Sequence, residues 1–172
     1  MEEVRRLEIG SGKFPRKGYT HIDIEASAKP DILGDFRTMS FSDLEEIIAL
    51  HVLEHFSREE ALKVLAQWNS WLKVGGRLIV ETPDLERICA LFTTQPERLW
   101  ANRWYLNQSL YGSQEADWAF HRDGWWKDKF EELFPKLGFK IIKVWQKHSY
   151  IRYGESRTRY RLPDIRVVAE KI

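Results

Sequence analysis

The 172-residue sequence has a single cysteine, no long apolar run and no excess of charge of either sign. Because Cys89 cannot form an internal disulfide, a reducing compartment and a cytoplasmic location are expected. The N-terminus leads directly into a strand-like run, and no apolar stretch is long enough to cross a bilayer. We therefore expect neither a signal peptide nor a membrane span. The formal net charge of +1 argues against a dedicated nucleic-acid or membrane-surface protein.

Internal repeats, low-complexity tracts and obvious linkers are also missing, so we expect one domain over residues 1–172. Short apolar runs predict strands at residues 4–9, 19–24, 31–34, 46–50 and 77–81, and "FKIIKVW" and "IRVVAEKI" predict two more. Ser57 and Glu60 have capping-box spacing, so a helix is expected to begin at Arg58 and to end at Gly75 and Gly76. A further helix is expected over residues 127–137. This alternation predicts an α/β fold, a mostly parallel sheet flanked by helices with a C-terminal antiparallel strand pair.

The loop after the first predicted strand lacks one glycine of a dinucleotide fingerprint. Gly10 and Gly12 are present, but Pro15 stands where the third glycine belongs, and the sequence contains no G-K-[ST] run. Asp23 ends the second predicted strand, where a carboxylate can accept both hydroxyls of a ribose. These features favour a nucleoside ligand without a phosphate chain. Turn glycines beside a solvated aspartate are the alternative.

Five elements occur in an order that resembles a known family. They are "LEIGSG" (7–12), Asp23, "GDF" (34–36), "ALHVLEHF" (49–56) and "LKVGGRLIVETPDLE" (72–86). Together they resemble the class I S-adenosylmethionine-dependent methyltransferases, in particular the small type-11 members. The resemblance covers residues 4–86 well and the remainder loosely, and it implies a Rossmann-like methyltransferase fold with S-adenosylmethionine as cofactor.

Carried over by position, the resemblance implies a cofactor-binding set that follows the first four predicted strands. Its members are Glu8, Gly10, Ser11, Gly12, Asp23, Ile24, Asp35, Phe36, His51 and Leu53. Asp23 would hold the ribose hydroxyls, Asp35 would accept from the adenine amino group, and His51 would lie beside the sulfonium. Glu54 and His55 match the family's "EH" pair, for which capping and packing or a direct chemical role both stay open.

The spacer between the first two predicted strands departs from the family pattern. Nine residues, 10–18, join the two strands, whereas a parallel crossover normally needs a dozen or more. The first helix is therefore expected to be reduced to a turn. Lys13, Arg16 or Lys17 would then supply the positive charge for the cofactor carboxylate that a helix N-terminus otherwise provides; solvated side chains are the alternative.

Residues 84–123, here named the aromatic insert, are the segment expected to form a lid over the substrate. His121 is the candidate general base or substrate contact, and a histidine hydrogen-bonded within a packed loop is the alternative. Tyr111, Trp118 and Trp125 are the candidate substrate contacts in and just after the insert. As core residues, the tryptophans would instead anchor a lid with little regular structure.

These observations predict an enzyme that transfers a methyl group to a small-molecule or saccharide-type acceptor. No metal site and no membrane or nucleic-acid partner are expected, and the oligomeric state is left open. An RNA or protein methyltransferase is the alternative, supported by basic and aromatic residues near the C-terminus: Arg152, Tyr153, Arg157, Arg159, Tyr160 and Arg161. A methyltransferase-like domain that binds the cofactor without catalysis also stays open.

Overall fold

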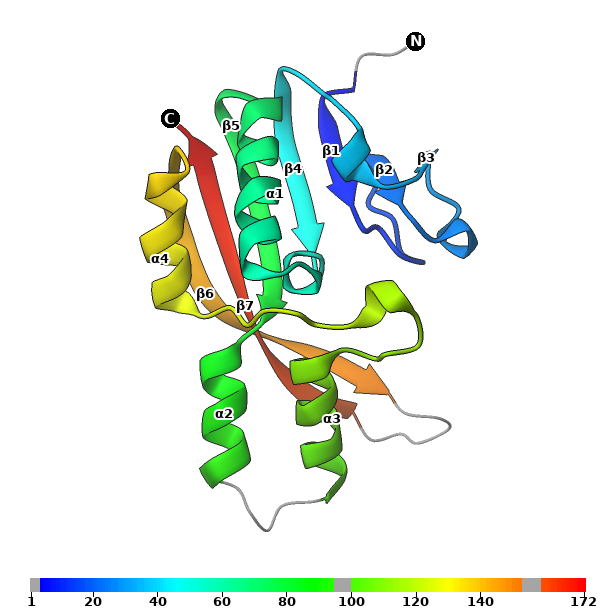
Figure 1. Ribbon diagram of the computed structural model, residues 1–172, viewed down its shortest axis with the longest axis vertical. Helices are drawn as coiled ribbons and strands as arrows, with labels where there is room; N and C mark the ends of the chain where they lie inside the picture. Colours follow the sequence, from blue (N-terminus) through cyan, green and yellow to red (C-terminus); the bar gives the residue numbers. More distant parts are fainter. Residues whose placement is uncertain (1–3, 95–99, 153–158) are drawn as a thin grey trace.

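A seven-stranded sheet in the order β3-β2-β1-β4-β5-β7-β6 organises the computed structural model, which describes residues 4–94, 100–152 and 159–172 (Figure 1). The strands are β1 (Arg6–Ile9), β2 (Thr20–Asp23), β3 (Ile32–Leu33), β4 (Leu44–Leu50), β5 (Leu72–Pro83), β6 (Phe139–Arg152) and β7 (Arg159–Lys171). Strands β1 to β5 pair in parallel, whereas β7 runs antiparallel to both β5 and β6. The predicted α/β fold, with its antiparallel C-terminal pair, is confirmed.

The helices fall into two groups (Figure 1). Helices α1 (Arg58–Trp71) and α4 (Lys127–Lys136) pack against the sheet, and their apolar side chains complete its core. Helices α2 (Leu85–Thr94) and α3 (Trp100–Tyr111) pack against each other and against β7, beyond the carboxyl end of β5. Short 3-10 turns complete the set: η1 (Ala26–Ala28), η2 (Phe36–Thr38), η3 (Leu53–His55) and η4 (Asp117–Ala119). No helix among the described residues is both long and apolar enough to cross a membrane.

Two local predictions at the strand ends have different outcomes. Residues 10–19 contain turns and no helix, as the short spacer predicts. The predicted end of the first helix at Gly75 and Gly76 is wrong. Helix α1 ends at Trp71 because Leu72 adopts an extended backbone and pairs with Leu44, so that both glycines belong to β5.

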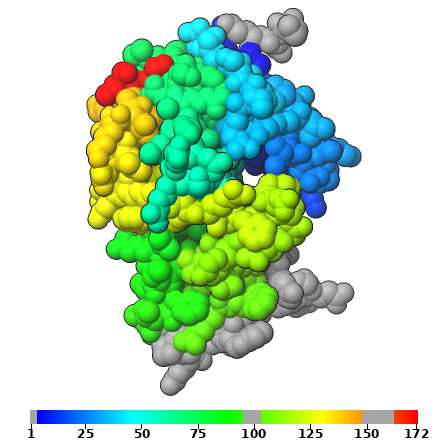
Figure 2. All heavy atoms as spheres, viewed as in Figure 1, coloured from blue at the N-terminus to red at the C-terminus, as the bar shows by residue number. Residues whose placement is uncertain are grey.

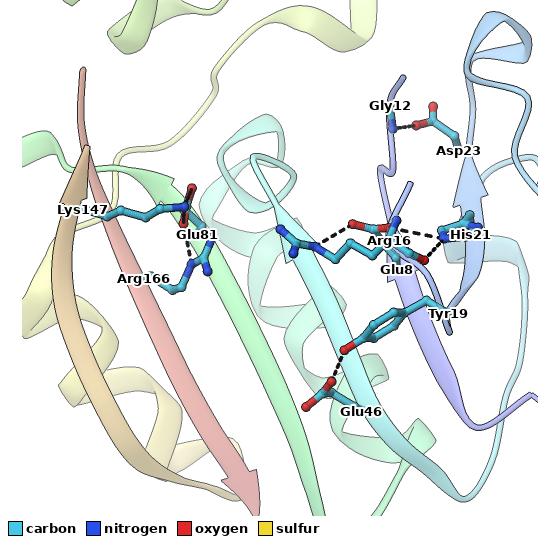
Figure 3. Close-up of polar contacts among 10 residues, drawn as sticks. All are labelled: Glu8, Gly12, Arg16, Tyr19, His21, Asp23, Glu46, Glu81, Lys147 and Arg166. Carbon is cyan, nitrogen blue, oxygen red and sulfur yellow. Dashed lines mark hydrogen bonds and ion pairs between the residues drawn. The ribbon is translucent and has the colours of Figure 1, made fainter. Parts of the chain in front are cut away.

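Side chains alternate between two different faces of the sheet, as the period of a strand requires. One face is apolar: Leu7, Ile47, Leu78 and Val167 are fully buried with Trp68 of α1 in the core. The other face carries charged residues joined by ion pairs, and Figure 3 draws those of Glu8 and Glu81. The sheet is therefore held by apolar packing on one face and by electrostatic contacts on the other.

The N-terminus of α1 depends on a capping box in which Ser57 Oγ accepts from the backbone N–H of Glu60, and the Glu60 carboxylate accepts from the N–H of Ser57. Replacing Ser57 with alanine removes one of the two caps. We expect the free energy of unfolding, measured by urea denaturation, to fall by about 1 kcal/mol. Ser57→Thr keeps the hydroxyl and is the control, so an equal loss in both variants would contradict this assignment.

Candidate functional site

A cavity of about 880 Å³ opens at the carboxyl ends of β1, β2, β3 and β4. Parallel strands place these ends at one edge of the sheet, which is where ligands bind in open α/β folds. Loops after β1, β2, β3 and β4 line the sheet side of the cavity, and residues 115–118 with Arg122 of the aromatic insert line the opposite side. Figure 2 shows the insert, in yellow-green, lying against the blue N-terminal residues.

The glycine loop has the conformation that a close approach to a ligand requires. Gly10 has a φ of +67°, and a Cβ atom there would lie 2.6 Å from Cγ2 of Val52, so only glycine fits. The backbone N–H of Gly12 donates to Oδ2 of Asp23 (2.9 Å), and that of Glu25 donates to Oδ1 (2.9 Å; Figure 3 draws the first bond). Asp23 thus joins the two loops, and each carboxylate oxygen keeps a lone pair for a ligand hydroxyl.

Three predicted cofactor residues lie outside the cavity wall. Glu8 points to the polar face of the sheet, where it accepts from the backbone N–H of Arg16 (2.7 Å) and pairs with its guanidinium (3.1 Å; Figure 3). Glu8 therefore orders the glycine loop from the polar face of the sheet, and the Arg16 guanidinium is already paired with the Glu8 carboxylate. Ser11 and Leu53 are likewise absent from the cavity lining, whereas Lys13 is part of it.

The remaining predicted residues of the cofactor set line the cavity. Asp35 caps η2 and binds the Arg37 guanidinium through three hydrogen bonds (3.0, 3.0 and 2.7 Å), and these bonds lower the pKa of Asp35. The carboxylate is therefore ionised and available as an acceptor. Phe36 is buried, with its ring edge-on to Phe56 (5.8 Å between centroids), so it joins the cavity wall to the core. Ile24 and His51 also line the cavity.

His51 terminates β4 in a left-handed conformation (φ +55°) that turns its side chain toward three carboxylates. Its Nδ1 lies 3.2 Å from Glu54, and its Nε2 lies 3.5 Å from Glu81 and 3.9 Å from Asp164. Burial alone lowers the pKa of this ring, but hydrogen bonds to Glu54 and Glu81 outweigh it and raise the pKa of His51 to about 10. A positive charge therefore sits at the edge of the cavity at neutral pH.

The aromatic insert folds back on itself at Gly112. An isolated bridge pairs Gly112 with Phe120, and a Cβ at Gly112 would lie 1.9 Å from the carbonyl oxygen of Ala119. The fold-back carries Trp118 to the cavity wall, where its side chain is partly exposed. Trp118 is thus the predicted aromatic contact that the structure brings to the cavity.

His121 lies behind the cavity wall, among the residues of η3. Its Nδ1 is 2.8 Å from the carbonyl oxygen of Ser109, and its ring meets that of His55 edge-on with 4.9 Å between centroids. Burial lowers the pKa of His121 and so favours the neutral form of the ring. Of these two histidines, His55 lines the cavity and His121 does not.

Trp125 and Tyr111 are not brought to the cavity. Trp125 is only 1% exposed and stacks on Phe130 in the core (4.9 Å between centroids), because a bridge to Asp84 ties its backbone to the end of β5. Tyr111 ends α3 and is largely exposed. Of the basic C-terminal segment, Tyr153 and Arg157 lie outside the described residues.

Sequence reasoning missed several cavity residues: Glu25, Val52, Glu115, Asp117 and Arg122. Val52 had a signal, since it directly follows His51 at the end of β4. The three residues of the insert had none, because their position depends on the fold-back at Gly112 and on the bond from the N–H of Arg122 to the carbonyl oxygen of Glu54 (2.8 Å).

Comparisons with known proteins identify the fold of this chain. The sequence matches no protein-family model, and no curated protein sequence matches it. The chain is similar to a SAM-dependent methyltransferase from Methanosarcina mazei, with a TM-score of 0.67, 17% identity and coverage of 100% of this chain and 94% of that chain. It is also similar to a SAM-dependent methyltransferase from Archaeoglobus fulgidus, with a TM-score of 0.61, 14% identity and coverage of 99% of this chain and 87% of that chain. For a SAM-dependent methyltransferase from Anabaena variabilis, the TM-score is 0.61 and the identity 12%, with coverage of 98% of this chain and 77% of that chain. The chain has the Rossmann-like methyltransferase fold that the sequence motifs predict.

Proposed function

We propose that this chain is an S-adenosylmethionine-dependent methyltransferase that acts on a small-molecule or saccharide-type acceptor. The observation that carries the proposal is the position of Asp23, which ends β2 at the cavity and is held by the N–H groups of Gly12 and Glu25. A carboxylate fixed in this way is preorganised to accept two vicinal hydroxyls of a ribose. The methyltransferase fold of similar solved structures supports the same proposal.

The cavity residues fit the chemical groups of this cofactor. Asp35 offers an ionised acceptor for the adenine amino group, and Phe36 offers a ring edge or face beside it. Gly10 leaves room where any side chain would meet Val52. Lys13, at the cavity wall, is our candidate for the positive charge that faces the cofactor carboxylate, since Arg16 is paired with Glu8.

When bound, S-adenosylmethionine supplies a sulfonium methyl group, so the protein mainly has to align the acceptor and exclude water. Trp118 and Arg122 of the insert would hold the acceptor against the open side of the cavity. His55 lines that wall, with His121 behind it, so His55 is the nearer of the two rings to a bound acceptor. The catalytic role of His121 stays a prediction, as does the cytoplasmic location.

Calorimetric titration of the full chain with S-adenosylmethionine and S-adenosylhomocysteine tests the proposal. We expect one binding site per chain with a micromolar dissociation constant for each ligand. We expect no binding of NAD, because the glycine loop lacks the third glycine that a pyrophosphate site requires. Absence of binding by both sulfur ligands would contradict the proposal.

A further inference from the structure

Glu54, His55 and His121 form a cluster outside the predicted cofactor-binding set. One ring nitrogen of each histidine and one carboxylate oxygen of Glu54 all lie within 4.8 Å of one another. Two of the residues come from η3, and the third arrives from the insert 66 positions after His55. We propose that this cluster is a binding site for a divalent transition-metal ion of the zinc type, held by two imidazoles and one carboxylate.

The second observation is an unsatisfied oxygen on Glu54. The residue is only 2% exposed, and while Oε1 contacts His51 at 3.2 Å, Oε2 is buried and makes no hydrogen bond within the described part of the chain. The His51 ring compensates Oε1, but a buried carboxylate oxygen without a hydrogen-bond partner of its own is costly, because it has lost its hydrogen bonds to water. A cation bound between Glu54 and the two histidines would satisfy it.

The tautomers of both histidines suit metal binding. Nδ1 of His55 lies 3.0 Å from the carbonyl oxygen of Phe120, and Nδ1 of His121 lies 2.8 Å from that of Ser109. A carbonyl oxygen can only accept, so each neutral ring carries its proton on Nδ1 and keeps a lone pair on Nε2. A backbone carbonyl that fixes the second ring nitrogen is the usual support of a metal-bound histidine.

The donor set selects the class of ion. Imidazole nitrogens favour zinc and its neighbours over Mg²⁺ and Ca²⁺, which prefer oxygen ligands. Bonds of about 2.1 Å place tetrahedral ligand atoms about 3.4 Å apart, so small side-chain rotations close the cluster around the ion. Three protein ligands leave a fourth position open, as in sites that bind water or a substrate atom.

A neighbouring cluster of possible metal ligands differs in the cations that surround it. His51, Glu81 and Asp164 also come within 4.8 Å of one another. There, however, Lys147 and Arg166 already neutralise Glu81. A metal ion there would have to compete with these fixed cations, whereas Glu54 is paired through Oε1 with the His51 ring and its Oε2 has no hydrogen-bond partner in the described part of the chain. The proposed site is therefore the Glu54 cluster.

The site adjoins the cavity through His55, which belongs to both. Its open position can therefore face an oxygen or nitrogen atom of the acceptor, a role that rests on the proposed function. The metal site itself does not, since it depends only on the three side chains. The sequence alone indicates no metal site and makes His121 a candidate base, whereas in the proposed site His121 is a metal ligand.

The test uses the full chain without a histidine tag, stripped with a chelator and titrated calorimetrically with ZnCl₂ in the absence of cofactor. We expect the unmodified chain to bind one Zn²⁺. In Glu54→Gln and in His121→Gln we expect the affinity for Zn²⁺ to fall by about tenfold or more. Glu59→Gln and His21→Gln remove the same chemical groups outside the cluster and should keep the affinity of the unmodified chain. Circular dichroism checks that each variant folds.

A second measurement needs no variant. Co²⁺ added to the unmodified chain should give visible absorption bands of a nitrogen- and oxygen-bound ion, without the thiolate band that binding at Cys89 would produce, and Zn²⁺ should remove them. Absence of stoichiometric Zn²⁺ binding, a thiolate band, or affinities equally lowered in the cluster and control variants would overturn the proposal. Binding of S-adenosylmethionine is measured separately, so failure of one proposal does not imply failure of the other.

Discussion

Replacing Glu81 with alanine should lower the free energy of unfolding by about 3–5 kcal/mol, the range typical of breaking a buried ion pair by removal of one partner. The Glu81 side chain is only 4% exposed, on the polar face of the sheet. Arg166, its direct partner on β7, donates from Nε, and Nζ of Lys147 on β6 lies 3.1 Å away (Figure 3). The carboxylate therefore holds three adjacent strands together.

Removal of this carboxylate would leave several cations facing one another. Arg166, Lys147 and the charged ring of His51 all lie against Glu81, and Arg166 is mostly shielded from water. Without the anion, their mutual repulsion adds to the lost hydrogen bonds. Glu59→Ala is the control, because Glu59 pairs with Lys63 on the exposed surface of α1 and its removal should leave stability nearly unchanged.

The same residue predicts a pH dependence. Burial raises the pKa of Glu81, but the hydrogen bond from His51 and the charge of Arg166 outweigh it and lower the pKa to about 2, from 4.5. Because the folded-state pKa lies below the unfolded-state value, the contribution is complete above about pH 5 and is lost as the pH falls toward 2. At about 1.4 kcal/mol per pKa unit, the contribution of ionised Glu81 to the free energy of unfolding amounts to about 3 kcal/mol.

Urea denaturation of the unmodified chain and of Glu81→Ala between pH 7 and pH 3 measures both effects. We expect the difference between the two proteins to shrink as the pH falls, because below about pH 4.5 the unfolded chain binds a proton at Glu81 that the folded chain, with its lowered pKa, does not bind. A difference that stays constant with pH would assign the effect to packing and contradict the electrostatic explanation.

The fold could be predicted from local signals wherever these agree with the tertiary contacts. The capping box of Ser57 and Glu60, the apolar strands and the short spacer after Gly10 each act within a few residues, and the structure has them as predicted. The end of α1 could not be predicted from Gly75 and Gly76. It depends on pairing of Leu72 with Leu44, 28 positions apart in sequence, and on the close approach of Gly76 to the carbonyl oxygen of Leu44.

In the candidate site, too, local signals predict the positions of some residues, and tertiary contacts decide the positions of others. Asp23 ends a strand, and Gly10, Gly12 and Asp35 follow the ends of strands within three residues, so the parallel sheet brings all four to one edge. Trp118 and Trp125 are chemically alike and seven positions apart, yet Trp118 lies at the cavity and Trp125 in the core. Composition cannot separate them, because the fold-back at Gly112 and the bridge to Asp84 decide their positions.

Substitution of Asp23 with alanine should weaken binding of S-adenosylhomocysteine about 100-fold, or about 3 kcal/mol. This is the order expected when two hydroxyls lose charge-assisted hydrogen bonds to one carboxylate. Titration calorimetry on both proteins measures the change. A change of less than about threefold would contradict the assignment of Asp23 to the ribose.

Asp23 also orders the loops after β1 and β2, so a loss of affinity alone would not identify the ribose contact. A double-mutant cycle separates the two roles. The unmodified chain should prefer adenosine over 2′,3′-dideoxyadenosine, because only adenosine offers hydroxyls to the carboxylate. Asp23→Ala should bind both more weakly and about equally. If the preference for adenosine persists in the variant, the carboxylate acts through the loops, and the hydroxyls must be recognised by another group such as Glu25, which also lines the cavity.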